Sequence, residues 1–137
     1  MSYAGDVTPE QAWAGLRDEP GAVLVDVRTR AEWSYVGLPD LSSLGKEPVL
    51  LEWQSFPTGA VNVGFTDELA AAGVAKDAPL YLLCRSGVRS VAAAEAATRE
   101  GWTRAHNVLH GFEGPHDDQR HRSVAGWKVA GLPWVQG

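Results

Sequence analysis

The sequence predicts an α/β fold in which helices flank a central, mostly parallel sheet. Short apolar runs typical of buried strands, at 22–27 and 80–84, alternate with helical patterns such as 91–100. Strands that alternate with helices along a chain favour parallel βαβ units. A length of 137 residues suffices for one domain with its own hydrophobic core. We therefore expect a single domain over residues 1–137.

The first half of the chain is predicted to contain two capped helices around a buried strand. Thr8 is expected to cap the first helix, with Gln11 completing a capping box. Thr29 and Glu32 have the same spacing and predict a second, short helix. Between these helices, the run 22–27 is rich in β-branched residues and is expected to form a strand buried on both faces.

The second half is predicted to continue the alternation. Strands are expected at 49–53, 60–65, 80–84 and 107–109, and helices at 66–72, 91–100 and 127–132. Thr66 is expected to cap the first of these helices, and Gly73 to end it. In open parallel sheets, sites lie beyond the carboxyl ends of the strands, so residues that follow a strand are the candidates for chemistry.

The composition favours a water-soluble, cytoplasmic protein. A net charge of −5 disfavours a nucleic-acid partner, since such binding depends on basic surface. Apolar runs all fall short of the ~20 residues that a membrane helix needs, so no membrane partner is expected. Residues 1–6 lack the basic and apolar regions of a signal peptide, and a single cysteine suits a reducing compartment.

Cys84 is the one cysteine of the chain and the main candidate for a catalytic residue. It follows the apolar strand and opens the run Cys-Arg-Ser-Gly-Val-Arg, ahead of the helix at 91–100. A helix N-terminus offers unpaired N–H groups and the positive end of the helix dipole. With two arginines, these surroundings favour a thiolate beside an anion site. The alternative, a buried cysteine that acts only as a small apolar side chain, is less favoured.

Several segments resemble those of the rhodanese-like domain family. The run 26–33, Asp-Val-Arg-Thr-Arg-Ala-Glu-Trp, resembles the family's first signature, and 84–89 looks like its six-residue active-site loop. The run 58–62 is similar to a Pro-Gly-Ala-x-Asn segment, and 111–112 with 126–133 to a Gly-rich closing segment. The resemblance covers about residues 8–134. It implies a rhodanese-like sandwich with a mostly parallel five-stranded sheet between helices.

The resemblance also implies a sulfurtransferase that works through a persulfide on Cys84. The Cys84 thiolate would attack the outer sulfur of a small anionic donor such as thiosulfate, and a thiol, cyanide or protein acceptor would then remove that sulfur. Asp26 and Arg28 are expected to support the loop. Curled backbone N–H groups would form an anion nest, which makes the following residues candidates for substrate binding: Arg85, Ser86, Gly87, Val88 and Arg89.

Other functions stay open at this point. One is a sulfur-relay or interaction module that takes persulfide sulfur from a partner protein, with little thiosulfate activity. Another is a phosphatase or arsenate reductase. Tyrosine-type phosphatases use a seven-residue loop from Cys to Arg, whereas Cys84 to Arg89 counts six. The lack of a second cysteine opposes a reductase that cycles through a disulfide.

The chain departs from the family in two insertions, at about 38–57 and 113–125. The first replaces a Gly-His-Ile-type segment, so the usual His is missing after Gly37. The second carries His116 and His121 with two aspartates, but without a second ligand cluster of standard spacing a solvated loop is expected. We predict no metal and no cofactor. His110 is interpreted as a structural hydrogen-bond partner, with substrate contact as the alternative. Glu32 is expected to pair with Arg28 or Arg30.

Overall fold

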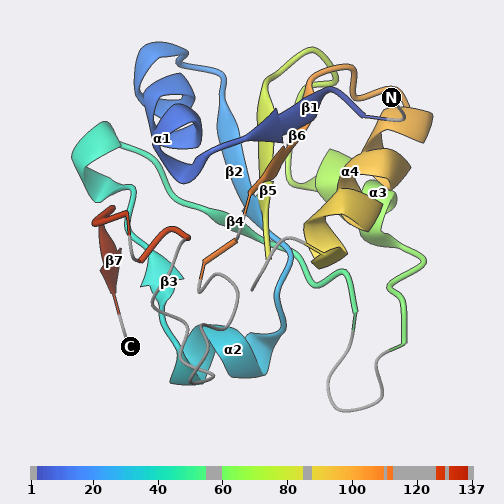
Figure 1. Cartoon of the computed structure of the whole chain (residues 1–137). Coiled ribbons are helices and arrows are strands. Elements are labelled where there is room, and N and C mark those ends of the chain that lie inside the picture. The colour runs from blue at the N-terminus through green and yellow to red at the C-terminus, as the bar shows by residue number, and fades with distance from the viewer. Residues whose placement is uncertain are drawn as a thin grey trace.

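Five parallel strands form the central sheet of the computed structural model, which describes residues 3–54, 60–84, 88–109, 111–112, 126–128 and 130–135. The strand order is β1-β6-β5-β2-β4 (Figure 1). The strands of this sheet are β1 (Gly5–Val7), β2 (Val23–Asp26), β4 (Val49–Leu50), β5 (Leu80–Leu83) and β6 (Ala105–Val108). A separate antiparallel pair joins β3 (Leu38–Pro39) to β7 (Trp134–Val135). The expected α/β class and the parallel five-stranded sheet are confirmed.

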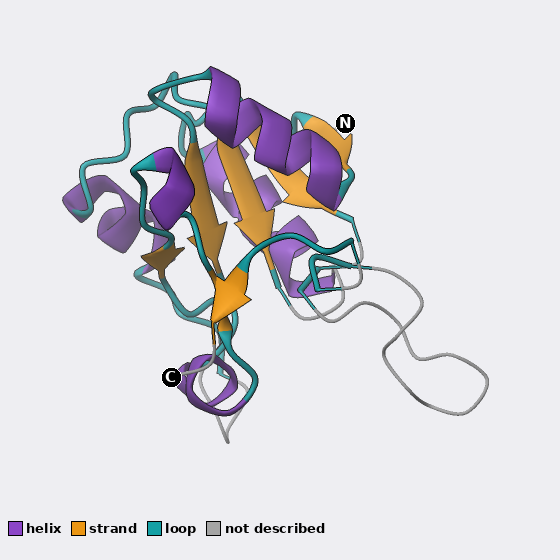
Figure 2. Ribbon diagram, turned by 90° about the vertical axis from the view of Figure 1, so that its left-hand side faces the viewer, coloured by secondary structure: helices purple, strands orange, loops and turns teal. Residues whose placement is uncertain are grey.

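Helices cover both faces of this sheet. The helices of the described residues are α1 (Pro9–Asp18), α2 (Arg30–Tyr35), α3 (Phe65–Ala71), α4 (Val88–Arg99) and the short 3-10 helix η1 (Ser42–Leu44). Figure 1 shows α1 on one side of the sheet and α3 with α4 on the other. Seen from the side, α2 lies beyond the carboxyl ends of the central strands (Figure 2). None of the helices among the described residues is long and apolar enough to span a bilayer.

The alternation of side chains along β5 divides the core into two layers. Leu80, Leu82 and Cys84 belong to the layer that α3 and α4 cover, whereas Tyr81 and Leu83 belong to the layer beneath α1. Successive side chains of a strand point to opposite faces, so this apolar run fills both layers at once. The thiol of Cys84 therefore lies on the α4 side of the sheet.

Both predicted capping boxes are present. The Gln11 N–H donates to Thr8 Oγ1 over 3.1 Å, and the Gln11 side chain accepts from the Thr8 N–H over 2.9 Å. Thr29 and Glu32 repeat this arrangement at the start of α2. The boxes satisfy N–H groups that a helix start leaves unpaired, which fixes where the chain turns from strand to helix.

The strand predicted at 60–65 is wrong. In this segment only Val61 pairs, through an isolated bridge with Gln54. The Asn62 side chain accepts from the Gly64 N–H over 3.0 Å, and such a side-chain turn redirects the chain. Helix α3 therefore begins at Phe65, with Gly64 rather than Thr66 as its cap.

The C-terminal segment and the N-terminal strand also differ from expectation. In place of the helix predicted at 127–132, residues 126–128 and 130–131 form turns, and Gly131 has a φ of +78° that interrupts helical geometry. The strand predicted at 107–109 begins earlier, at Ala105, and is followed by β7. Strand β1 was not expected, because three residues carry too little periodicity to reveal a strand.

Removing the cap of α1 should destabilise the fold measurably. We expect Thr8→Ala to lower the free energy of unfolding by about 1 kcal/mol, since the Gln11 N–H loses its acceptor. Thr8→Ser keeps the oxygen and should lose less than half of that. Urea denaturation of both variants tests this, and equal losses would contradict the capping role.

Candidate functional site

Cys84 lies at the carboxyl end of β5, immediately before the segment that leads into α4. The residue is only 1% exposed. Its carbonyl accepts the Phe112 N–H over 2.7 Å, which ties the strand end to the closing segment of the chain. Its Sγ lies 3.3 Å from Oγ of Ser90, on the first turn of α4. The thiol is thus enclosed between the sheet and a helix N-terminus.

The predicted loop falls partly outside the described residues. Arg85, Ser86 and Gly87 are in that part of the chain, as is His110. Val88 begins α4 and Arg89 occupies its first turn. The substrate-binding role of the loop therefore stays a prediction, and the described geometry concerns Cys84 and the residues around it.

Arg89 forms a two-pronged ion pair with Glu32 of α2. The Nη1–Oε1 distance is 2.7 Å and the Nη2–Oε2 distance is 2.9 Å, and both side chains are mostly buried. Burial raises the pKa of Glu32, but the bonds from Arg89 and the Thr29 N–H lower that pKa by a larger amount. The net shift is therefore downward. Burial lowers the pKa of Arg89, and the bond to Glu32 reverses this into a net rise. The expected pairing of Glu32 with Arg28 or Arg30 is wrong, because α2 faces the start of α4.

Asp26 and Arg28 form a second ion pair, which is completely buried. Arg28 Nε lies 2.9 Å and Nη2 2.7 Å from the Asp26 carboxylate oxygens, and Nη2 also donates to the Gly37 carbonyl over 2.7 Å. The guanidinium lies 4.2 Å above the Phe112 ring. Because Phe112 bonds to the Cys84 carbonyl, this pair braces the strand end from the face opposite the thiol.

Three polar residues that are linked in series to the thiol were not predicted from the sequence. Ser90 and Asn107 are both buried, and Ser90 Oγ donates to Asn107 Oδ1 over 2.5 Å. Asn107 Nδ2 in turn donates to Asp6 Oδ1 over 3.0 Å. Ser90 directly follows the predicted loop, and Asn107 is polar within a predicted strand. The positions of Ser90 and Asn107 in the sequence therefore hint at a role in the site, but no local pattern connects these two residues with Cys84.

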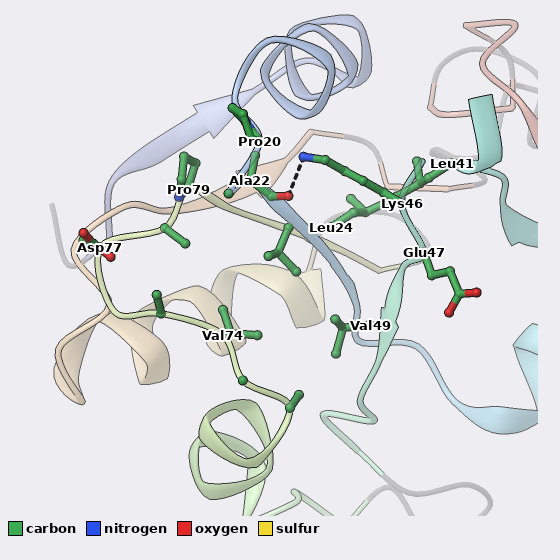
Figure 3. A pocket seen from close by; sticks show the side chains of 16 residues that line it. Pro20, Ala22, Leu24, Leu41, Lys46, Glu47, Val49, Val74, Asp77 and Pro79 are labelled. Atoms are coloured by element: carbon green, nitrogen blue, oxygen red, sulfur yellow. Dashed lines mark hydrogen bonds between the residues drawn. The ribbon is translucent and has the colours of Figure 1, made fainter. Parts of the chain in front are cut away.

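A separate hollow of about 530 Å³ lies at the amino ends of the strands. Figure 3 shows Leu24 and Val49 on its walls, with Lys46 at one side. Lys46 Nζ donates to the carbonyls of Glu19 and Ala22 over 2.9 and 2.8 Å. The hollow begins where β2 starts, whereas Cys84 follows the end of β5, so it is distinct from the thiol site. The described residues hold no cluster of three or more His, Cys, Asp or Glu side chains that suits a metal.

Comparisons with known proteins agree with this fold. A family model described as the STR4 middle domain matches residues 4–137. An uncharacterized protein of Rickettsia conorii is 37% identical over 94% of this chain and 95% of its own length. Thiosulfate sulfurtransferase GlpE of Glaesserella parasuis is 30% identical, over 80% of this chain and 83% of its own length.

A solved structure gives the same result at the level of the fold. The crystal structure of Rv0390 from M. tuberculosis superposes with a TM-score of 0.92 at 55% sequence identity, covering 98% of this chain and 99% of that one. The chain is therefore a rhodanese-like domain and belongs to the family of the STR4 middle domain.

The Glu32–Arg89 ion pair should make stability depend on pH. The folded protein holds the pKa of Glu32 below its ordinary value of 4.5, so the unfolded chain takes up the proton first as pH falls. The stability that this group supplies is present above that value and is lost below it. We expect Glu32→Gln to lose less free energy of unfolding than the parent between about pH 7 and about pH 3.

Glu10→Gln is the matched control, because Glu10 lies exposed on α1 and has the same change of charge outside the pair. Denaturant titrations across the pH range give the comparison. Identical pH dependence in the parent and in Glu32→Gln would contradict a contribution from the ion pair.

Proposed function

We propose that this domain is a sulfurtransferase that carries sulfane sulfur as a persulfide on Cys84, with thiosulfate or a similar small anion as donor. The observation that carries the proposal is the position of Cys84, enclosed at the carboxyl end of β5 and at the start of α4. Sites of parallel sheets lie at this edge. A relative that aligns with this chain over 83% of its own length is named a thiosulfate sulfurtransferase.

The proposed reaction balances without any oxidant or cofactor. The Cys84 thiolate forms a bond to the outer sulfur of thiosulfate, the sulfur–sulfur bond of the donor breaks, and sulfite leaves with the bonding electrons. An acceptor thiolate or cyanide then attacks the terminal sulfur of the persulfide. The acceptor leaves with this sulfur bound to it, and the Cys84 thiolate is restored. Both half-reactions need an environment that stabilises an anion at Sγ.

The surroundings of the thiol supply that environment by two routes. The twelve-residue helix α4 begins just beyond Cys84 and directs its positive end there. Arg89 adds an electrostatic attraction to Cys84, although Glu32 already occupies two of its nitrogens. In this proposal Arg89 fixes the loop end and its charge acts from a distance.

Intact mass spectrometry tests the first half-reaction, since the chain has one thiol. We expect incubation with thiosulfate to add one sulfur atom, which cyanide removes and which Cys84→Ser never acquires. If a reduced and accessible Cys84 gains no sulfur from thiosulfate but does so from a persulfidated protein, the domain is a relay module instead. Turnover of para-nitrophenyl phosphate that depends on Cys84 would point to a phosphatase.

Removing Arg89 should slow sulfur uptake through charge. Arg89→Leu removes the positive charge that attracts the Cys84 sulfur and leaves the Glu32 carboxylate without its arginine partner. We therefore expect persulfide formation at neutral pH to fall about tenfold. The double variant Arg89→Leu with Glu32→Gln removes both charges and should regain part of that rate. Reaction mixtures that are stopped at successive times and analysed by intact mass spectrometry give the rates. A double variant as slow as the single one would contradict the electrostatic explanation.

A further inference from the structure

A chain of hydrogen bonds connects the sulfur of Cys84 with the edge of the sheet. Ser90 Oγ lies 3.3 Å from Cys84 Sγ and 2.5 Å from Asn107 Oδ1. Asn107 Nδ2 donates to Asp6 Oδ1 over 3.0 Å, and the Tyr3 hydroxyl donates to the same oxygen over 2.7 Å. Ser90 and Asn107 are buried, whereas Asp6 is exposed. The connection therefore runs from a buried thiol to solvent.

Asp6 fixes the orientation of the Asn107 amide. The two residues are direct neighbours in the parallel pairing of β1 with β6. An ionised carboxylate only accepts hydrogen bonds, so the amide must present its NH₂ group to Asp6 and its oxygen to Ser90. Asn107 Oδ1 is consequently an acceptor that faces the Ser90 hydroxyl in every state of the site.

Ser90 has a single proton for two acceptors. When that proton goes to Asn107 Oδ1, the sulfur as a thiol can donate its own proton to Ser90 Oγ. When the proton turns to an anionic sulfur, Asn107 Oδ1 loses the one donor that the described residues offer it. A buried acceptor without a partner is unfavourable. Asn107 therefore competes with the thiolate for the Ser90 proton.

We propose that Asn107 is a positioning residue that sets the protonation of Cys84 by drawing the Ser90 proton away from the sulfur. Its importance for turnover rests on the proposed function, in which Cys84 alternates between thiolate and persulfide. Each time the sulfur becomes anionic, the hydroxyl rotates toward it and leaves Asn107. The position of this equilibrium determines how readily the nucleophile forms.

Among the described residues, four other elements carry the charged groups that surround the thiol or are linked to it by hydrogen bonds. Arg89 of α4 interacts electrostatically with Cys84 and pairs with Glu32 of α2. At the end of β2, Asp26 and Arg28 form a closed ion pair. Asp6 on β1 is linked to the thiol only through Asn107 and Ser90. Substituting Asn107 by an apolar residue changes none of these charges, so it isolates the effect of the hydrogen bond.

The test is a pH titration of thiolate absorbance in the full chain, taken as the difference from the same protein carrying Cys84→Ser. Asn107→Leu keeps much of the side-chain volume but removes the acceptor. We expect its midpoint to fall by about one pH unit, because Ser90 is free to donate to the thiolate. In a Ser90→Ala background, Asn107→Leu should leave the midpoint where it was.

An unchanged midpoint in Asn107→Leu, or an equal shift with and without Ser90, would overturn the proposal. If Asn107→Leu does not fold, Asp6→Asn at the exposed position replaces it: its side chain no longer fixes the amide, and the same dependence on Ser90 is expected. The titration uses no sulfur donor. A failure of sulfur uptake would thus count against the proposed function alone, and a failure of the titration against the role of Asn107 alone.

Discussion

The hydrogen-bonded alignment of β2 with β5 is the constraint on which the site depends. The strands run parallel with Asp26 opposite Leu83, and the Val27 N–H donates to the Leu83 carbonyl over 2.8 Å. Both strands leave the sheet at the same edge, so Cys84 follows β5 where Val27 and Arg28 follow β2. Slipping the register by one residue would exchange the faces of all the side chains and carry the thiol away from α4. Because β2 and β5 are buried in the centre of the sheet, that exchange is strongly disfavoured.

The Asp26–Arg28 pair illustrates how charge is held beside an apolar core. Removing two ions from water is unfavourable by several kcal/mol each, and only close, multiple hydrogen bonds offset it. Here the side-chain contacts between the two groups measure 2.7 to 3.1 Å, and the Gly37 carbonyl accepts a further bond. The net gain in stability from such a pair is small. Its main consequence is geometric, since it holds the guanidinium against Phe112, which bonds to the carbonyl of Cys84.

Local sequence patterns predict the fold, but they do not predict which residues distant in the sequence become partners. Capping boxes and buried strands are properties of a few neighbouring residues. The turn at Asn62 is also local, and the bond from the Gly64 N–H to the Asn62 side chain is why the strand predicted at 60–65 is wrong. Glu32 and Arg89, by contrast, are 57 residues apart, and Asp6 and Asn107 are 101 apart. Such pairs follow from the order of the strands, which periodicity does not specify.

The groups around the thiol divide into those with fixed charge and those that adapt. The pKa of Glu32 is lowered and that of Arg89 raised, so both keep their charges throughout the neutral range and their field is constant. A group that responds to a change of charge at the sulfur is then a neutral one that can reorient its hydrogen bond. A hydroxyl can reverse its hydrogen bond by rotation alone, without moving a heavy atom. In the proposed arrangement this accounts for Ser90 and Asn107 being buried beside an apolar core layer. Ser90 and Asn107 are bonded to each other when the sulfur is a thiol, and Ser90 donates to the sulfur when it is anionic.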